Sequence, residues 1–275
     1  RDYYASRGLG DVYKRQRLYS RMVIICSILS FSCDLFLLFY HKIRYNTTVR
    51  KHQFGNEQQR KFREVCGMEY TENTAVGCVI MASGRAVRFG SNKLLADFGG
   101  APLIAQALDV TETPALAARV VVTRSPEVAE LACKAGVKTI LHSLPGRNDT
   151  VRLGLETLLS ELPGLAGCIF LPGDQPLLRK ESLEAMVLDF SALDEKERAI
   201  LRLGFRAEDG TERLGSPVLF GSSYFGALCS LPEGKGGGVV IRQHPESVRA
   251  VYAARQEELE DADTVEELER LRKLL

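Results

Sequence analysis

Short apolar runs alternate with amphipathic stretches from residue 76 to the end of the chain, and this alternation constrains the fold most strongly. The apolar runs have the length and β-branched content of buried strands, whereas the amphipathic stretches repeat apolar residues at helical spacing. Strands that alternate with helices form βαβ crossovers, so we predict a mostly parallel sheet with helices on both faces. We expect strands at 76–82, 119–123, 137–141, 167–171, 200–205, 217–220 and 248–251, and helices at 103–109, 126–135, 150–162, 180–190, 222–231 and 264–274.

The first 67 residues differ in composition from the rest of the chain. They hold 13 Lys+Arg against 5 Asp+Glu, a net charge of +8, whereas residues 68–275 hold 23 against 30, a net charge of −7. We therefore predict one domain over 68–275, long enough to bury a sizeable core, with a native start at Met68. Residues 11–16 (Asp-Val-Tyr-Lys-Arg-Gln) resemble the translation of a transposase mosaic end used in sequencing adapters. We interpret 1–67 as a non-native segment, translated from upstream DNA.

Residues 22–40 leave a second interpretation of that segment open. They form an apolar run long enough to span a bilayer, with basic residues on both sides. Asp34 interrupts the run, and no small-residue cleavage site follows it, which weighs against a membrane anchor and against a signal peptide. A membrane-anchor-like extension, or an extension of another kind, is the alternative.

Charge and cysteine content argue against several classes of protein. The acidic region 68–275 has no basic stripe, so a nucleic-acid surface is not expected. Four of the seven cysteines lie in this region without a Cys-x-x-Cys pair, so neither a zinc ribbon nor a redox motif is indicated. We expect a protein of the reducing cytoplasm, without a membrane partner.

A turn of small residues followed by basic residues comes directly after the first predicted strand. Residues 82–84 (Ala-Ser-Gly) let the backbone bend sharply and let a ligand approach it, and Arg85, Arg88 and Lys93 follow. Backbone N–H groups and cationic side chains together can bind a polyphosphate. The spacing matches neither a P-loop nor a G-x-G-x-x-G fingerprint, so the turn alone is as compatible with an ordinary solvated βα loop as with an anion-binding site.

A second polar motif follows the fourth predicted strand. Residues 172–176 (Pro-Gly-Asp-Gln-Pro) place Asp174 just past the strand end. In open α/β sheets, ligands bind beyond the carboxyl ends of the strands, so we expect Asp174 to lie beside the first turn. A carboxylate there either caps the next helix or binds a metal. Proximity to a polyphosphate site favours Mg²⁺, which binds through one or two carboxylates plus substrate phosphates.

These motifs together resemble the MobA-like nucleoside triphosphate (NTP) transferase family, which includes molybdenum-cofactor cytidylyltransferases and guanylyltransferases. The family's motifs recur in the same order and cover residues 75–275. They correspond to 82–93, 98–103 (Phe-Gly-Gly-Ala-Pro-Leu), 172–176, 215–220 (Gly-Ser-Pro-Val-Leu-Phe) and 261–267 (Asp-Ala-Asp-Thr-Val-Glu-Glu). The resemblance implies a three-layer, Rossmann-like sheet of the nucleotide-diphospho-sugar transferase type. Ala86 replaces the family's usual serine, which removes one phosphate hydrogen bond.

The resemblance also implies a reaction and the residues that perform it. A Mg²⁺-dependent enzyme would transfer a nucleoside monophosphate from an NTP to a phosphate-bearing acceptor and release pyrophosphate. CTP is the expected nucleotide, because the Ala-Ser-Gly turn is closer to the cytidylyl branch. Molybdopterin is the expected acceptor, and a molybdoenzyme apoprotein is the expected recipient of the product. The implied catalytic residues are Lys93, Arg88 and Asp174, the implied nucleotide-binding residues are Ala82, Ser83, Gly84, Arg85, Arg88, Lys93, Asp149 and Thr150, and the implied metal ligands are Asp174 and Asp263.

Several interpretations stay open at this point. Asp263 either binds the metal or caps the last predicted helix. Residues 146–152 correspond to the family's base-contacting loop, whereas 234–238 (Gly-Lys-Gly-Gly-Gly) either contact the acceptor or form a plain turn. His142 is expected to be structural. The competing functions are a guanylyltransferase, a sugar-1-phosphate nucleotidylyltransferase, and a nucleotide-binding accessory or sensor protein without turnover.

Overall fold

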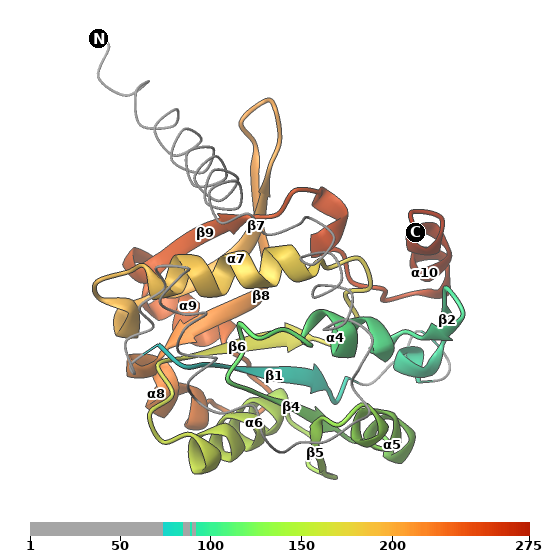
Figure 1. Cartoon of the computed structure of the whole chain (residues 1–275), viewed down its shortest axis with the longest axis horizontal. Coiled ribbons are helices and arrows are strands. Elements are labelled where there is room, and N and C mark those ends of the chain that lie inside the picture. The colour runs from blue at the N-terminus through green and yellow to red at the C-terminus, as the bar shows by residue number, and fades with distance from the viewer. Residues whose placement is uncertain (1–73, 85–88, 90–91) are drawn as a thin grey trace, which may run out of the picture. The chain divides into compact units, whose positions relative to one another are not determined.

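The computed structural model describes residues 74–84, 89 and 92–275 (Figure 1). The predicted non-native or anchor-like segment 1–67 lies outside the described residues, as do Arg85 and Arg88. The domain boundary near Met68 therefore stays a prediction. In the part of the chain that is described, no helix combines the length and apolar character needed to cross a bilayer.

A seven-stranded sheet forms the middle layer, in the order β5-β4-β1-β6-β8-β7-β9 (Figure 1). Its strands are β1 (Val76–Ala82), β4 (Ala118–Thr123), β5 (Lys138–Leu141), β6 (Gly167–Pro172), β7 (Ile200–Arg206), β8 (Glu212–Gly221) and β9 (Val248–Tyr252). β8 runs antiparallel to β6 and β7, and the other neighbouring strands are parallel. The predicted mostly parallel sheet is confirmed. A separate short hairpin joins β2 (Asp97–Phe98) to β3 (Ala101–Pro102).

Helices cover both faces of the sheet. One face packs against α4 (Ile104–Val110), α5 (Pro126–Lys134) and α7 (Lys180–Ser191), and the other against α6 (Arg147–Glu161), α8 (Phe225–Cys229) and α9 (Gly238–Gln243). The last helix, α10 (Val265–Arg272), adds Leu268 and Leu271 to the first core and lies beside β2, where Arg272 pairs with Asp97. Successive strand residues point to opposite faces, so Cys78 and Ile80 of β1 join the first core and Val79 joins the second. Short 3-10 helices complete the structure: η1 (Lys93–Leu95), η2 (Lys196–Arg198), η3 (Ser222–Tyr224), η4 (Pro245–Ser247) and η5 (Gln256–Leu259).

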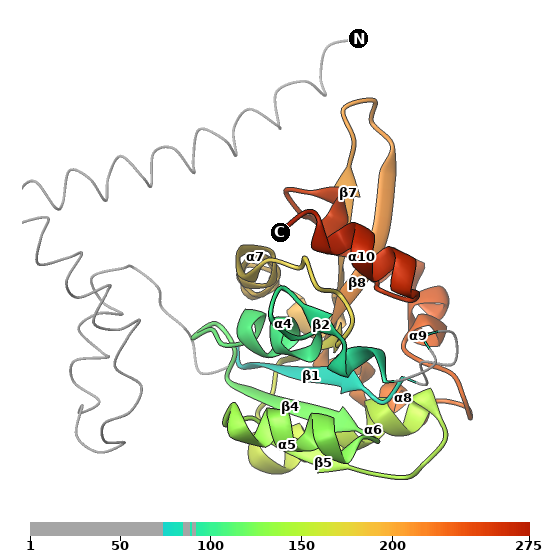
Figure 2. The same cartoon turned by 90° about the vertical axis from the view of Figure 1, so that its right-hand side faces the viewer.

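Two predicted elements differ from the structure. β8 begins at Glu212 rather than at 217, because its polar first half pairs with β7 in a hairpin that turns at Gly210 (φ 84°). Figures 1 and 2 show this hairpin extending past the other strands. In place of the predicted helix 222–231, the structure has a 3-10 helix at 222–224 followed by the short helix α8. The helix α9 was not predicted. Apolar periodicity misses both features, since charged residues begin β8 and glycines precede α9.

The chain reverses its direction of travel across the sheet at β1. From β1 it continues to β4 and β5 on one side, then returns to β6 on the other side. Such a switch point is where open α/β sheets bind ligands, beyond the carboxyl ends of the strands. Gly173 brings the loop after β6 against the end of β1, with its N–H donating to the Met81 carbonyl (3.0 Å). A side chain at 173 would press on that oxygen at 3.3 Å and on Ile104 at 3.0 Å.

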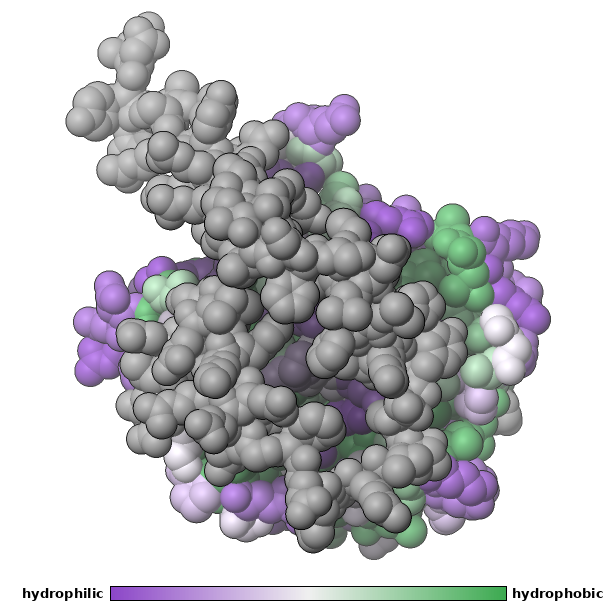
Figure 3. Space-filling model, in the orientation of Figure 1, coloured by the Kyte–Doolittle hydropathy of each residue, from purple (hydrophilic) through white to green (hydrophobic). Residues whose placement is uncertain are grey.

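On the face seen in Figure 3, hydrophilic side chains of the described residues lie along the edges, with smaller apolar areas between them. The large apolar side chains that are exposed come from different elements, among them Leu141, Leu188 and Val265. Scattered exposed residues of this kind are normal for a folded surface.

Candidate functional site

Lys93 lies at the centre of an ionic cluster at the switch point. Its Nζ atom is 2.5 Å from Oδ2 of Asp174 and 2.7 Å from Oδ1 of Asp263. The Lys93 side chain is only 10% exposed, compared with 21% for Asp174 and 54% for Asp263. We call these three residues the lysine–carboxylate cluster. It brings together the loop after β1, the loop after β6 and the segment before α10.

Local structure fixes each member of this cluster. Asn92 caps η1 by accepting a hydrogen bond from the Leu94 N–H (3.2 Å). Lys93 is the first residue of this short helix, and Leu94, the next residue, anchors it in the core. Asp174 follows Gly173, the residue that lies against the end of β1. The Ala262 N–H donates to the Asp174 carbonyl (2.9 Å), which holds the segment that carries Asp263 beside the loop after β6.

Thr264, rather than Asp263, caps the last helix. Its hydroxyl oxygen accepts a hydrogen bond from the Glu267 N–H (3.1 Å), and the Glu267 carboxylate accepts bonds from the N–H groups of Thr264 (3.0 Å) and Asp263 (2.9 Å). This is a capping box. Of the two alternatives for the Asp263 side chain, the structure therefore favours the one that leaves its carboxylate at the cluster.

The charges of the cluster act on one another. Burial lowers the pKa of Lys93, but the charges and hydrogen bonds of Asp174 and Asp263 outweigh burial, so the pKa is raised and the ammonium stays charged at neutral pH. Asp261 lies beside the cluster and was not among the predicted site residues. Desolvation of its carboxyl group, then the charges of Asp174 and Asp263, raise the pKa of Asp261 to about 6, although the residue as a whole is exposed. The Asp-Ala-Asp spacing of 261–263 was the available signal.

A second group of contacts holds the turn after β1. The Ser83 hydroxyl donates to the Val122 carbonyl (3.0 Å), and the same oxygen lies 2.8 Å from Nε2 of His142. A serine hydroxyl has one proton, so Nε2 must carry the hydrogen and donate it, and Nδ1 keeps a lone pair. That Nδ1 atom is buried without a hydrogen-bond partner among the described residues. We call Ser83, Val122 and His142 the Ser83–His142 contact.

Arg124 strengthens the same turn and was not predicted. Its guanidinium donates to the Ser83 carbonyl and, at 3.5 Å, to the carbonyl of Pro145. Burial and the positive charge of Arg124 lower the pKa of His142, while Asp149 opposes them. A lowered pKa favours the neutral imidazole at pH 7, and the expected structural role of His142 stays a prediction.

The first residues of α6 lie next to this turn. The helix begins at Arg147, and the Asp149 carboxylate accepts a hydrogen bond from the Gly146 N–H (3.0 Å), while Thr150 is buried. The Asn148 side chain accepts a bond from the Gly234 N–H (2.9 Å), so the glycine-rich loop 234–238 packs against the start of α6. Asp149 thus orders its own loop, and its role toward a nucleotide stays a prediction.

The carboxylates of the lysine–carboxylate cluster have the chemistry of a Mg²⁺ site. In the described part of the chain, no three or more His, Cys, Asp or Glu residues converge as a complete metal site. Mg²⁺ does not need such a group, because it keeps several waters and binds one or two carboxylates plus phosphates. A cationic group, the ammonium of Lys93, already lies between the oxygens of Asp174 and Asp263. These residues therefore fit the ion that the sequence implies.

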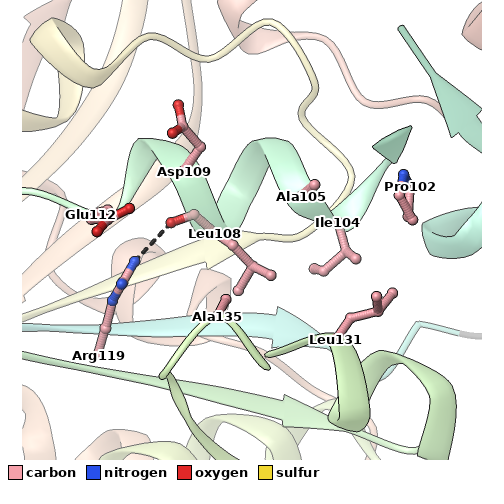
Figure 4. A pocket seen from close by; sticks show the side chains of 9 residues that line it. All are labelled: Pro102, Ile104, Ala105, Leu108, Asp109, Glu112, Arg119, Leu131 and Ala135. Atoms are coloured by element: carbon pink, nitrogen blue, oxygen red, sulfur yellow. Dashed lines mark hydrogen bonds between the residues drawn. The ribbon is translucent and has the colours of Figure 1, made fainter. Parts of the chain in front are cut away.

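A pocket of about 280 Å³ between α4 and α5 is separate from both groups of residues (Figure 4). Its walls are mostly apolar, with Ile104, Leu108 and Leu131 among the lining residues. Arg119, at one end, donates to the Leu108 carbonyl (2.7 Å). Three charged residues, Asp109, Glu112 and Arg119, also line it, at the end away from Pro102.

The chain belongs to the family of MobA-like NTP transferase domains, whose model it matches over residues 78–248. It is 28% identical, over 112 residues, to a probable molybdenum cofactor guanylyltransferase of Pyrococcus horikoshii, a match over 41% of this chain. The chain spans about half of that relative, 55% of its length.

Solved structures share the fold. Rv0371c of Mycobacterium tuberculosis H37Rv has a TM-score of 0.59 at 22% identity, covering 73% of this chain and 99% of that one. Its complex with manganese gives a TM-score of 0.54 at 21% identity, covering 74% and 100%. A CMP:2-keto-3-deoxy-manno-octonic acid synthetase complexed with CTP gives 0.59 at 16% identity, covering 73% and 98%. At these identities the likeness shows the fold alone.

Proposed function

We propose that this protein transfers a cytidine monophosphate unit from CTP to the phosphate of molybdopterin, with Mg²⁺, and releases pyrophosphate. The observation that carries the proposal is the lysine–carboxylate cluster at the switch point of a nucleotidyltransferase sheet. A cation and two carboxylates beyond the ends of β1 and β6 are the groups that an NTP and its metal require.

In the proposed reaction, an oxygen of the acceptor phosphate attacks the α-phosphorus of CTP. A new P–O bond forms as the bond to the β-phosphate breaks, and pyrophosphate takes the electron pair. The acceptor oxygen is already negative, so no strong general base is needed. Positioning and charge neutralisation are the main requirements of phosphoryl-type transfer.

The chain's own residues divide this work. Asp174 and Asp263 would hold Mg²⁺, which when bound supplies positive charge to the phosphates. The ammonium of Lys93 would stabilise the negative charge that develops on the transferred phosphate. Arg85 and Arg88, which lie outside the described residues, and the backbone of residues 82–84 would bind the triphosphate. Asp149 and Thr150, at the start of α6, would lie near the base.

GTP is the second candidate nucleotide. The relative from P. horikoshii is named a guanylyltransferase, which favours GTP, whereas the Ala-Ser-Gly turn favours CTP. The product would pass to a molybdoenzyme apoprotein. A sugar-1-phosphate acceptor would use the same residues and mechanism.

The test is pyrophosphate release by the full chain with Mg²⁺, each of the four NTPs, and molybdopterin, a sugar 1-phosphate or no acceptor. We expect release with CTP that depends on molybdopterin. Release with GTP but not with CTP would assign GTP as the nucleotide. Release only with a sugar phosphate would assign a sugar phosphate as the acceptor in place of molybdopterin. Nucleotide binding without release under any condition would contradict an enzymatic role and indicate an accessory or sensor protein.

A further inference from the structure

The ammonium of Lys93 contacts both carboxylates that are the expected ligands of a divalent cation, and this bears on the order in which nucleotide and metal bind. Its ammonium contacts one oxygen of Asp174 at 2.5 Å and one of Asp263 at 2.7 Å. The same two carboxylates are the expected metal ligands. Charge-assisted contacts of this length are among the stronger ones in proteins, and at 10% exposure water screens the lysine only weakly.

We propose that Lys93 is a built-in counter-ion that occupies the metal position until a triphosphate draws it away. The inference rests on the proposed function, because it concerns the same site, and it adds a coupling between two ligands. In the nucleotide-free protein a divalent cation must first displace the ammonium from both carboxylates. A bound triphosphate offers Lys93 new anionic partners, so the carboxylates become free for the metal.

Because Lys93 is mostly buried, displacing its ammonium from the carboxylates is energetically unfavourable. A displaced ammonium without an anionic partner would be an unpaired charge in a mostly buried position, which is unfavourable. The nucleotide therefore changes the metal affinity, and by linkage the metal changes the nucleotide affinity by the same factor.

Asp263 is the partner that can exchange most easily. Its side chain is 54% exposed, whereas Asp174 is 21% exposed. Its backbone N–H is held by Glu267, independently of the carboxylate. The segment can therefore keep its place while the carboxylate changes its cation.

The experiment measures Mn²⁺ binding to the full chain by calorimetry, with and without α,β-methylene-CTP, a CTP analogue that cannot transfer its nucleotide. Lys93→Met removes the ammonium and keeps the side-chain length, and Lys93→Gln is a second variant in case the first does not fold. Lys138→Met is the matched control, because Lys138 pairs with Glu161 on the surface. Circular dichroism checks the fold of each variant.

Without nucleotide, we expect Lys93→Met to bind Mn²⁺ at least about tenfold more tightly than the wild type, within the usual range of coupling between ligands. With the analogue bound, the two proteins should differ little. Lys138→Met should match the wild type throughout.

Two results would overturn the proposal. Equal Mn²⁺ affinity of wild type and variant without nucleotide, or no binding by either, would show that Lys93 does not hold the metal position. A rise that is equal with and without the analogue would show that Lys93 acts only through its electrostatic field. Failure of the analogue to bind the wild type would instead contradict the proposed nucleotide chemistry, and the nucleotide-free titrations would still decide the role of the lysine.

Discussion

The lysine–carboxylate cluster and the Ser83–His142 contact lie at the ends of neighbouring strands but are built on different principles. The first joins opposite charges, and two of its three side chains keep contact with solvent. The second joins neutral groups, in which a buried hydroxyl bonds a backbone carbonyl and an uncharged imidazole. Charged groups that exchange partners suit catalysis, whereas neutral buried bonds suit a rigid backbone. Under the proposed function, the lysine–carboxylate cluster would perform the transfer and the Ser83–His142 contact would hold the turn.

The largest expected effect comes from Asp174→Asn, which removes a charge and keeps the shape. We expect kcat to fall by about 100- to 1,000-fold, the usual loss when one electrostatic contact is removed from a transition state. Asp263→Asn should cost less, about 10- to 100-fold, because that carboxylate is more exposed. Steady-state pyrophosphate release measures both.

The fold should survive both substitutions, because Lys93 keeps one carboxylate in each variant. Asp209→Asn, at the exposed turn between β7 and β8, is the control and should keep wild-type activity. Near-normal kcat for Asp174→Asn would contradict the catalytic role of the cluster.

Ser83→Ala should act mainly on stability and on the KM for the nucleotide. It leaves the Val122 carbonyl and the His142 N–H without their partner, at a cost of about 1–3 kcal/mol. The melting temperature should then fall by roughly 2–4 °C for each kcal/mol of lost stability. A large loss of kcat at an unchanged melting temperature would mean that Ser83 belongs to the transfer chemistry instead.

The smallest expected effect is a pH dependence of stability that arises from His142. Its pKa is lowered in the folded protein, so the unfolded chain binds more protons as the pH falls below the ordinary value of 6.5. This part of the stability is present above pH 6.5 and is lost as the pH falls through the lowered pKa. Denaturant unfolding between pH 7.5 and about 5 should show a smaller loss for His142→Gln than for the wild type. Parallel curves for the two proteins would exclude His142 as the cause.

The strands of the sheet were predicted well from the sequence, because most of them are short apolar runs that alternate with helices. The sequence pattern could not predict that β8 begins at Glu212, because the first half of this strand is held by its antiparallel pairing with β7 and not by a run of apolar residues. The sequence also predicted that Asp174 and the loop that carries Lys93 lie together beyond the carboxyl ends of the strands, because they follow the ends of β6 and β1.

The remaining parts of the site depend on contacts between distant segments. Asp263 reaches Lys93 because the Ala262 N–H bonds the Asp174 carbonyl. Buried Glu258 anchors the preceding segment by accepting bonds from the Arg179 N–H and the Ser182 hydroxyl. Nothing in the local pattern around Glu258 or Arg124 predicts such contacts.

In the proposed reaction, the α-phosphorus of an NTP becomes bonded to a phosphate-bearing acceptor. The most direct test is the mass of the product formed by the full chain with CTP, Mg²⁺ and molybdopterin. We predict a product that has the mass of the acceptor joined to cytidine monophosphate, and its loss in Asp174→Asn. Free cytidine monophosphate or diphosphate as the sole nucleotide product, with the acceptor unchanged, would contradict the account.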